Sequence, residues 1–259
     1  MTRRTDTLMG DMPFTVEVAG GADPAVLDAV FAELRSVDRA FSPFIPESAV
    51  SRINAGSLRE DDADPLVREV LELCRTYEVA TCGYFSAWAS GQLDPCGLVK
   101  GWAIERACEI LERAGYRSYF VDGGGDVQTR GERAPGRPWR VGIRHPVRRD
   151  RVVEVLEATD LAVATSGTYE KGAHIRDPHT GRAATDLVSL TVVGPDIVAA
   201  DVYATAAFAM GHGGLGFIES VPGYEALAID RDLFSASTSG FAELFPRPAG
   251  TVVLPPPVA

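Results

Sequence analysis

The sequence predicts an α+β fold, in which helices pack against antiparallel or mixed β-sheets. The 259 residues are 46% hydrophobic and 24% charged, as in a globular domain with a substantial core. Apolar residues recur at helical spacing in the first half of the chain, and short apolar runs typical of strands dominate the second half. No repeat or linker divides the chain, so we expect one domain over residues 1–259, with a proline-rich tail from about residue 246.

The elements of the first half have clear boundary signals. Apolar residues alternate over residues 13–20, which predicts a strand. Asp-Pro pairs at 23–24 and 64–65 each predict a helix, with Asp as the N-cap and Pro in the first turn. A third helix follows the Asp-Pro pair at 94–95 and ends at Gly115, because glycine accepts the left-handed conformation that often closes a helix.

Strands dominate the second half of the chain. The apolar segments that predict them are 117–122, 139–143, 152–158, 161–165 and 187–193. An alanine-rich helix over about 196–210 follows, closed by Gly211.

Composition and charge exclude two classes of partner. The net charge of −11 disfavours a nucleic-acid backbone, since that contact needs a basic face. No apolar run approaches the ~20 residues that cross a bilayer, so no membrane insertion is expected. Residues 1–11 lack the apolar core of a secretory signal, and no lipid-attachment cysteine follows them, which predicts a cytoplasmic protein.

Four stretches carry candidate chemistry, and the first is the helix start around Lys100. Gly97 and Gly101 would let a ligand approach the backbone, and the lysine could neutralise a phosphate. No Gly-x-x-x-x-Gly-Lys-Ser/Thr run fits the stretch, so it is not a phosphate-binding P-loop. By itself it also fits an ordinary helix start with a lysine that reaches solvent.

Two further stretches follow apolar strands. The three glycines in residues 122–127, DGGGDV, leave backbone without side chains, so a ligand could lie against it. A tight turn by itself explains one or two of these glycines. Residues 165–182 form a long polar segment, and such segments inside a compact domain are usually functional. His174 in this segment is a candidate general base because imidazole titrates near neutral pH, although a lone histidine is more often structural.

The fourth stretch is the alanine-rich helix. Asp201 and Thr205 are four residues apart, so they lie on one helical face among small and apolar neighbours. A buried carboxylate is costly unless it is paired or bound to a metal, and carboxylate and hydroxyl oxygens suit Mg²⁺. The alternative is that Asp201 pairs with an arginine while Thr205 bonds back to the carbonyl of Asp201.

Taken in this order, the motifs resemble the ApbE family, the FAD:protein FMN transferases, over nearly the whole chain. MGDMPFTVEV is similar to that family's N-terminal strand, and FSPFIPESAVSRIN to its segment of spaced serines and an aromatic residue. DPCGLVKGWAIERA is similar to its Asp-x-x-Gly-x-x-Lys-Gly helix, and HIRDPHTGR and ADVYATA match its two most specific motifs. The resemblance implies a tunnelling-fold-like domain with two pseudo-related subdomains.

The resemblance also implies roles for individual residues. Mg²⁺ would be held by the side chains of Asp201 and Thr205 and by the carbonyl of Gly97. His174 would be the general base, and Lys100 would neutralise the phosphates of FAD. Further contacts to FAD would come from Met9, Phe44, Tyr84, Phe85, Asp94, Gly124, Gly125, Thr165, Ser166 and Arg176.

The reaction implied by the resemblance is the Mg²⁺-dependent transfer of FMN from FAD to a threonine hydroxyl of a partner protein, with release of AMP. The partner would carry a threonine flavinylation motif, and FAD would be a substrate. This sequence departs from the family pattern on the flavin side: Ser86 stands where Asp is usual, and the segment 87–93 is short. Two alternatives stay open, which are hydrolysis of FAD to FMN and AMP and binding of FAD without turnover.

Overall fold

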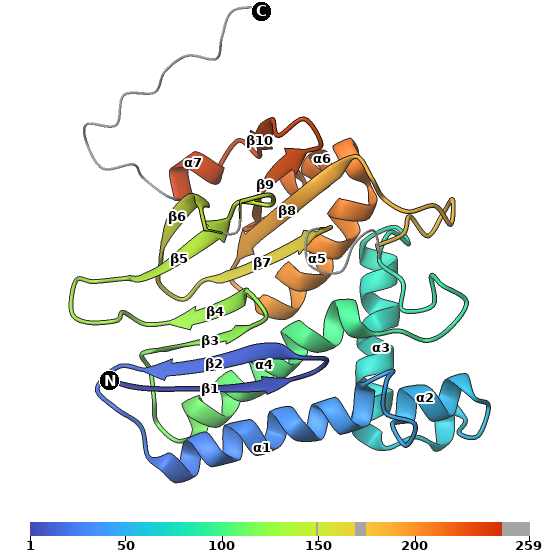
Figure 1. The fold of residues 1–259 in the computed structure, drawn as a ribbon, viewed down its shortest axis with the longest axis horizontal. Coiled ribbons are helices and arrows are strands. Elements are labelled where there is room, and N and C mark those ends of the chain that lie inside the picture. The colour runs from blue at the N-terminus through green and yellow to red at the C-terminus, as the bar shows by residue number, and fades with distance from the viewer. Residues whose placement is uncertain (149, 169–174, 245–259) are drawn as a thin grey trace, which may run out of the picture.

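The computed structural model describes residues 1–148, 150–168 and 175–244, so the proline-rich tail lies outside the described residues. An eight-stranded sheet with the order β1-β2-β3-β4-β7-β8-β9-β10 forms the framework, and every neighbouring pair is antiparallel (Figure 1). Its strands are β1 (Thr2–Leu8), β2 (Met12–Val18), β3 (Tyr119–Gly123), β4 (Asp126–Arg130), β7 (Ala162–Gly167), β8 (Leu187–Gly194), β9 (Glu225–Asp230) and β10 (Ser235–Ser237). A separate hairpin consists of β5 (Trp139–Arg144) and β6 (Val152–Ala158).

Helices and the hairpin cover opposite faces of this sheet. The helices are α1 (Pro24–Phe41), α2 (Ala49–Asn54), α3 (Pro65–Ala80), α4 (Cys96–Arg113), α5 (Ile197–Ala209), α6 (Gly214–Glu219) and α7 (Phe241–Leu244). Val192 on β8 belongs to the core shared with α1, α4 and α5, whereas its neighbour Val193 packs with the hairpin residues Trp139 and Leu156. Because successive strand residues face opposite sides, the sheet is buried on both faces. The α+β prediction is confirmed.

The chain uses the same order of elements twice. β1 and β2 pair, helices follow, and β3 and β4 then add next to β2. β7 and β8 likewise pair, α5 and α6 follow, and β9 and β10 add next to β8. The two four-stranded halves join through β4 and β7, in agreement with two pseudo-related subdomains in one continuous sheet.

Local signals place the predicted helices correctly. Asp23, Asp64 and Asp196 each accept a hydrogen bond from a backbone N–H in the first turn of α1, α3 and α5. Gly115, just after α4, has a φ of +91°, as expected for a glycine that closes a helix. The helix ends therefore agree with the sequence to within a few residues.

α4 and α5 approach each other closely at Gly101. A Cβ at this position would lie 2.8 Å from the carbonyl oxygen of Ile197 and 3.1 Å from the Cα of Val198, so only glycine permits this contact. α5 itself is buried on nearly all sides, between α4 and the strands β7 and β8. The start of α4 and the middle of α5 are thereby brought together.

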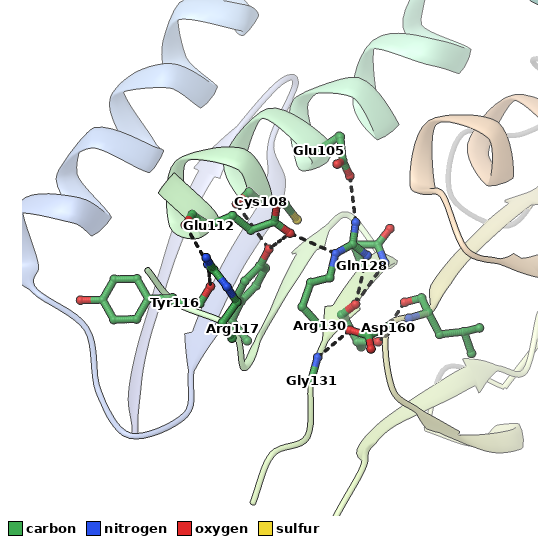
Figure 2. Close-up of polar contacts among 12 residues, drawn as sticks. Glu105, Cys108, Glu112, Tyr116, Arg117, Gln128, Arg130, Gly131 and Asp160 are labelled. Atoms are coloured by element: carbon green, nitrogen blue, oxygen red, sulfur yellow. Dashed lines mark hydrogen bonds and ion pairs between the residues drawn. The ribbon is translucent and has the colours of Figure 1, made fainter. Parts of the chain in front are cut away.

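A polar network joins the later turns of α4 to β4 (Figure 2). Arg130 forms ion pairs with Glu105 over 3.6 Å and with Glu112 over 3.2 Å. The Tyr119 hydroxyl donates to Oε1 of Glu112 over 3.0 Å. Since Arg130 pairs with two carboxylates of α4, the network ties α4 to the same strand that carries Asp126 near its start.

Four strands, β1, β4, β9 and β10, were not predicted from the sequence. β1 pairs with β2 alone among the described strands, and its residues alternate between half-buried and exposed, so it lacks the apolar pattern of a buried strand. β9 is followed by β10, which is exposed and only three residues long.

Within the described residues, no helix combines the length and apolarity needed to cross a bilayer.

Candidate active site

A cleft of about 250 Å³ lies where the start of α4, the middle of α5 and the end of β7 meet. It brings together most of the residues that the sequence singled out. The ones that line it are Tyr84, Phe85, Asp94, Gly97, Lys100, Thr165, Ser166, Arg176, Asp201 and Thr205. These come from segments more than 100 residues apart, so the fold assembles a site that the sequence only suggested.

Met9 and Phe44 lie in a second, apolar pocket of about 50 Å³. Both pockets are lined by Cys96 and Lys100, so they adjoin at the first turns of α4. Phe44 is 82% exposed and could pack against a ligand. The aromatic residues expected at FAD thus line two separate pockets that share Lys100. Phe44 lines one pocket, and Tyr84 and Phe85 line the other.

Lys100 lies between two buried carboxylates. Its Nζ forms an ion pair with Oδ2 of Asp126 and lies 3.3 Å from Oδ1 of Asp201. Burial lowers the pKa of Lys100, but the two carboxylates outweigh it and hold the pKa above its usual value. Burial raises the pKa of Asp201 to about 7, with Lys100 opposing and Asp126 adding to the rise. Two carboxylates and one ammonium leave the cluster with one excess negative charge when all three are ionised.

Asp201 is tied to α4 by the backbone as well. The N–H of Gly101 donates to Oδ2 of Asp201 over 2.9 Å. In a regular helix that N–H donates to the carbonyl four residues earlier, which is the carbonyl of Gly97. No arginine forms a salt bridge with Asp201 within the described parts of the chain, so the alternative of an arginine pair is not what the structure contains.

Thr205 lies one turn further along α5 and faces the same cleft. Its Oγ1 is 3.4 Å from Oγ of Ser166 at the end of β7. A Cβ built on Gly97 would lie 3.3 Å from Oγ1 of Thr205, so the absence of a side chain at Gly97 leaves its backbone next to this hydroxyl. Asp201, Thr205 and Gly97 therefore line the same cleft, with Gly97 next to the Thr205 hydroxyl.

Asp126 was not identified from the sequence, although the stretch DGGGDV was. It begins β4, and its Oδ1 accepts the backbone N–H of Thr165 over 2.9 Å while Oδ2 pairs with Lys100. The residue therefore links β4, β7 and α4 at the cleft. An acidic residue directly after a glycine run, at the start of a buried strand, is the signal that could have identified it.

Gly124 and Gly125 shape the turn before Asp126. Both have positive φ values, +64° and +99°, which glycine adopts without strain. The N–H of Gly125 donates to Oδ1 of Asp122, which closes the turn. Neither glycine lines the two pockets, so their contact with FAD stays a prediction.

The wall of the cleft before α4 is fixed by Asn54. Its side-chain amide donates to the carbonyl of Leu93 over 2.9 Å, and its carbonyl accepts the N–H of Leu93 over 2.8 Å. Asp94 then accepts the N–H of Cys96 over 3.1 Å at the start of α4. The short segment 87–93 is thus anchored at its end by a residue whose role the sequence did not reveal.

The segment 175–182 forms a tight turn that packs against Cys82 and Tyr84. Asp177 accepts the N–H of His179 and the hydroxyl of Thr180, both over 2.9 Å. His179 then contacts the carbonyl of Cys82 over 3.0 Å and the ring of Tyr84. His179 is thereby a structural link to the aromatic wall. His174, the expected general base, lies outside the described residues.

The donor chemistry of the cleft fits Mg²⁺. No group of three or more His, Cys, Asp or Glu side chains that could hold a metal occurs among the described residues. The cleft instead offers the carboxylate of Asp201 and the hydroxyl of Thr205, both hard oxygen ligands, with the backbone of Gly97 beside them, and the cluster carries excess negative charge when its two carboxylates are ionised. Such a set suits a cation that keeps several waters and also binds phosphate oxygens.

Comparison with known sequences gives a consistent result. The sequence model of the ApbE family matches residues 9–90 and 86–228. The FAD:protein FMN transferase of Vibrio cholerae serotype O1 is 35% identical over 129 residues, which are 46% of this chain and 39% of that protein. The FAD:protein FMN transferase of Treponema pallidum is 31% identical over 176 residues, 61% of this chain and 49% of that protein. The matched segments thus span less than half the length of these curated relatives.

Solved structures with the same fold extend over almost the whole chain. The apo form of the Pseudomonas stutzeri flavinyl transferase ApbE superposes with a TM-score of 0.80, at 26% identity, over 94% of this chain and 96% of that chain. The flavin transferase ApbE from Vibrio cholerae superposes with a TM-score of 0.81 over 93% of this chain and 98% of that chain. Because the two sequences are only 22% identical, this second similarity supports the shared fold alone.

Proposed function

Because the chain belongs to the ApbE family, we propose that it transfers FMN from FAD to a threonine hydroxyl of a partner protein in a Mg²⁺-dependent reaction that releases AMP. The observation that carries this proposal is the buried pairing of Lys100 with Asp126 and Asp201 in the cleft. The ammonium of Lys100 supplies a fixed positive charge that can bind a phosphate. The two carboxylates, when ionised, carry more negative charge than Lys100 neutralises, which favours a metal ion. A dinucleotide with a pyrophosphate needs both.

Asp201, Thr205 and the Gly97 carbonyl are the residues that would hold Mg²⁺. The N–H of Gly101 bonds to Asp201 and so competes with the helical bond to the Gly97 carbonyl, which supports a free lone pair on that oxygen. When bound, Mg²⁺ neutralises charge on the phosphate oxygens and favours attack on phosphorus. A cation there would also favour the ionised form of Asp201, whose pKa burial otherwise raises.

FAD would lie across the two pockets that share Lys100. The ammonium, held by Asp126, would donate to phosphate oxygens at the boundary between the pockets. Aromatic and apolar walls on either side, which include Phe44 and Tyr84, would pack against the ring systems. The substrate's charged middle would thus face the charged cluster, with its two flat ends on apolar surfaces.

The transfer itself would exchange the phosphoanhydride bond of FAD for a phosphoester bond. The threonine oxygen of the acceptor bonds to the phosphorus of the FMN half while the bond from that phosphorus to the AMP oxygen breaks. The threonine proton passes to a base, for which we propose His174, and Lys100 stabilises charge on the phosphate oxygens. The products are a phosphothreonyl-linked FMN and AMP.

Mass spectrometry of an acceptor protein tests this function directly. The protein is incubated with FAD, Mg²⁺ and an acceptor that carries a candidate threonine motif. A mass gain of one FMN on the acceptor, dependent on its threonine, supports the transfer. Free FMN and AMP without acceptor modification would indicate hydrolysis, and unchanged FAD would indicate binding alone.

A further inference from the structure

The segment that leads into β5 and turns toward β6 is basic in an acidic chain. Residues 133–151 contain seven of the 25 basic residues and one of the 36 acidic residues, although the chain has a net charge of −11. Like charges that gather in one segment repel each other, so the cluster does not stabilise the fold. A segment of opposite sign to the rest of the surface is typical of an electrostatic recognition site.

The tip of the hairpin presents these arginines to solvent. Along β5 the buried and exposed residues alternate, with Val141 and Ile143 inward and Arg144 outward. Arg148 and Arg151 in the turn are exposed, and neither side chain forms an ion pair within the part of the chain that the structure describes. We call Arg144, Arg148 and Arg151 the arginine tip.

Hydrogen bonds link the described residues of the turn that carries the arginine tip. Nδ1 of His145 accepts the N–H groups of Val147 and Arg148, each over 3.1 Å. The N–H of Arg151 donates to the carbonyl of Arg148 over 3.0 Å, and the N–H of His145 to the carbonyl of Arg151 over 2.9 Å. A surface that is ordered before binding loses less entropy when a partner docks.

Apolar side chains lie beside the arginines. Val147 is 64% exposed and Val152 is 56% exposed, and Val152 leans over Gly142, where a Cβ would lie 3.1 Å from its Cγ1. β5 and β6 pair only with each other among the described strands. Protein interfaces are enriched in arginine next to apolar contacts, and open strand edges can pair with an extended segment.

Arg144 of the arginine tip acts electrostatically on Asp122, near the end of β3. Asp122 is the residue before the glycine turn, and burial raises its pKa while the charges of Arg144 and Arg3 lower it. Arg144 therefore lies within electrostatic reach of the end of β3. The glycine turn that follows leads into Asp126, which holds Lys100.

We propose that the arginine tip is the docking surface for an acidic segment of the acceptor protein, an inference that rests on the transfer reaction proposed above. The acidic segment binds the arginines and the exposed valines while the acceptor's threonine reaches the cleft. A protein segment fits better than an anionic bilayer or a nucleic acid. Either of those presents an extended anionic surface, which the net charge of −11 on the chain would repel outside the short basic tip.

The test is peptide binding by the full chain, measured by fluorescence anisotropy. The probes are a fluorescein-labelled peptide rich in Asp and Glu and the same peptide with Asn and Gln. We expect the acidic peptide alone to bind, with an affinity that falls as salt rises. Arg148→Glu/Arg151→Glu should weaken binding by about tenfold or more. The control Arg68→Glu/Arg231→Glu makes the same charge change at exposed arginines elsewhere and should stay within about twofold.

Equal losses in the two double variants would overturn the proposal, because they would indicate a general charge effect. Binding of phosphatidylserine vesicles that depends on Arg148 and Arg151, without peptide binding, would also overturn it in favour of a membrane. The anisotropy assay needs neither FAD nor turnover, so its result stands apart from the transfer reaction. Where transfer is observed, the tip variant should raise KM for the acceptor and leave kcat and KM for FAD unchanged, and an unchanged acceptor KM would contradict the proposal.

Discussion

The backbone N–H of Gly101 donates a 2.9 Å hydrogen bond to the side chain of Asp201, across the interface of α4 and α5. These residues are 100 positions apart in the chain. The contact requires glycine at 101, because a Cβ would strike the backbone of α5. The geometry of the proposed metal site therefore depends on how closely two helices pack, and this dependence can be tested.

Replacing Asp201 tests the metal assignment. Asp201→Asn keeps an acceptor for the Gly101 N–H but loses the charge that would bind Mg²⁺. We expect Mg²⁺ affinity, measured by calorimetry, to fall by more than about 100-fold. This is a larger loss than the removal of a residue that only supports a metal ligand would cause. The fold should persist, because the volume hardly changes. Mg²⁺ binding and turnover equal to those of the unaltered protein would refute the assignment.

Asp126→Asn tests the anchor of Lys100. The amide can still accept the Thr165 N–H, but among the described residues Lys100 is left with Asp201 as its one carboxylate partner and competes with Mg²⁺ for it. We expect Mg²⁺ affinity to fall by about 10- to 100-fold. Asp122→Asn is the matched control, since this carboxyl lies beside the same glycine turn without pairing with Lys100. Similar losses in both variants would mean that the turn, and not the ion pair, is responsible.

Gly101→Ala tests the close approach of the helices. The new Cβ would force α4 away from Ile197, so we expect a loss of about 1–3 kcal/mol in unfolding free energy together with weaker Mg²⁺ binding. Gly216 in α6 has open space around its Cα, so Gly216→Ala should stabilise the protein by up to about 1 kcal/mol. Chemical denaturation measures both, and a neutral Gly101→Ala would contradict the packing argument.

The Arg130 network predicts a pH-dependent loss of stability. Burial raises the pKa of Glu105, Arg130 lowers it, and Asp196, Glu112 and Glu109 raise it further. Arg130→Met removes the one charge in that set that lowers this pKa. The free energy of unfolding should fall by on the order of 2 kcal/mol. This loss is smaller than for a fully buried ion pair, because Glu105 and Glu112 keep some contact with solvent.

The sign of this pH dependence follows from proton binding. With its folded-state pKa raised further, Glu105 holds a proton in the folded variant that it loses in the unfolded chain, so stability falls as pH rises through that window. The difference between Arg130→Met and the unaltered protein should therefore be larger at about pH 8 than at about pH 5. Denaturation at the two pH values measures it, and a difference that shrinks at high pH would contradict the prediction.

His174→Ala tests the base. We expect the rate of transfer to fall by roughly 10²-fold or more while Mg²⁺ and FAD still bind, because a base acts on the bond-forming step and not on binding. Single-turnover kinetics separate the two effects. A variant that loses FAD affinity but keeps its rate constant would show that His174 contributes to binding instead.

The sequence by itself determined the helices that carry the site and many of its residues. Asp caps, closing glycines and apolar periodicity are local signals, and the ends of α1, α3, α4 and α5 follow from them. Asp201 and Thr205 were identified because a polar pair on one face of an alanine helix is locally anomalous. Edge strands such as β1 carry no comparable apolar pattern and were missed.

Only the tertiary structure decided which of these residues meet. The pairing of Lys100 with Asp126, the hold of Asn54 on Leu93 and the position of the hairpin over the sheet join segments that lie far apart in the chain. Such contacts depend on strand register and on the distance between packed helices. Those quantities result from the packing of the whole core, so no local stretch of sequence encodes them.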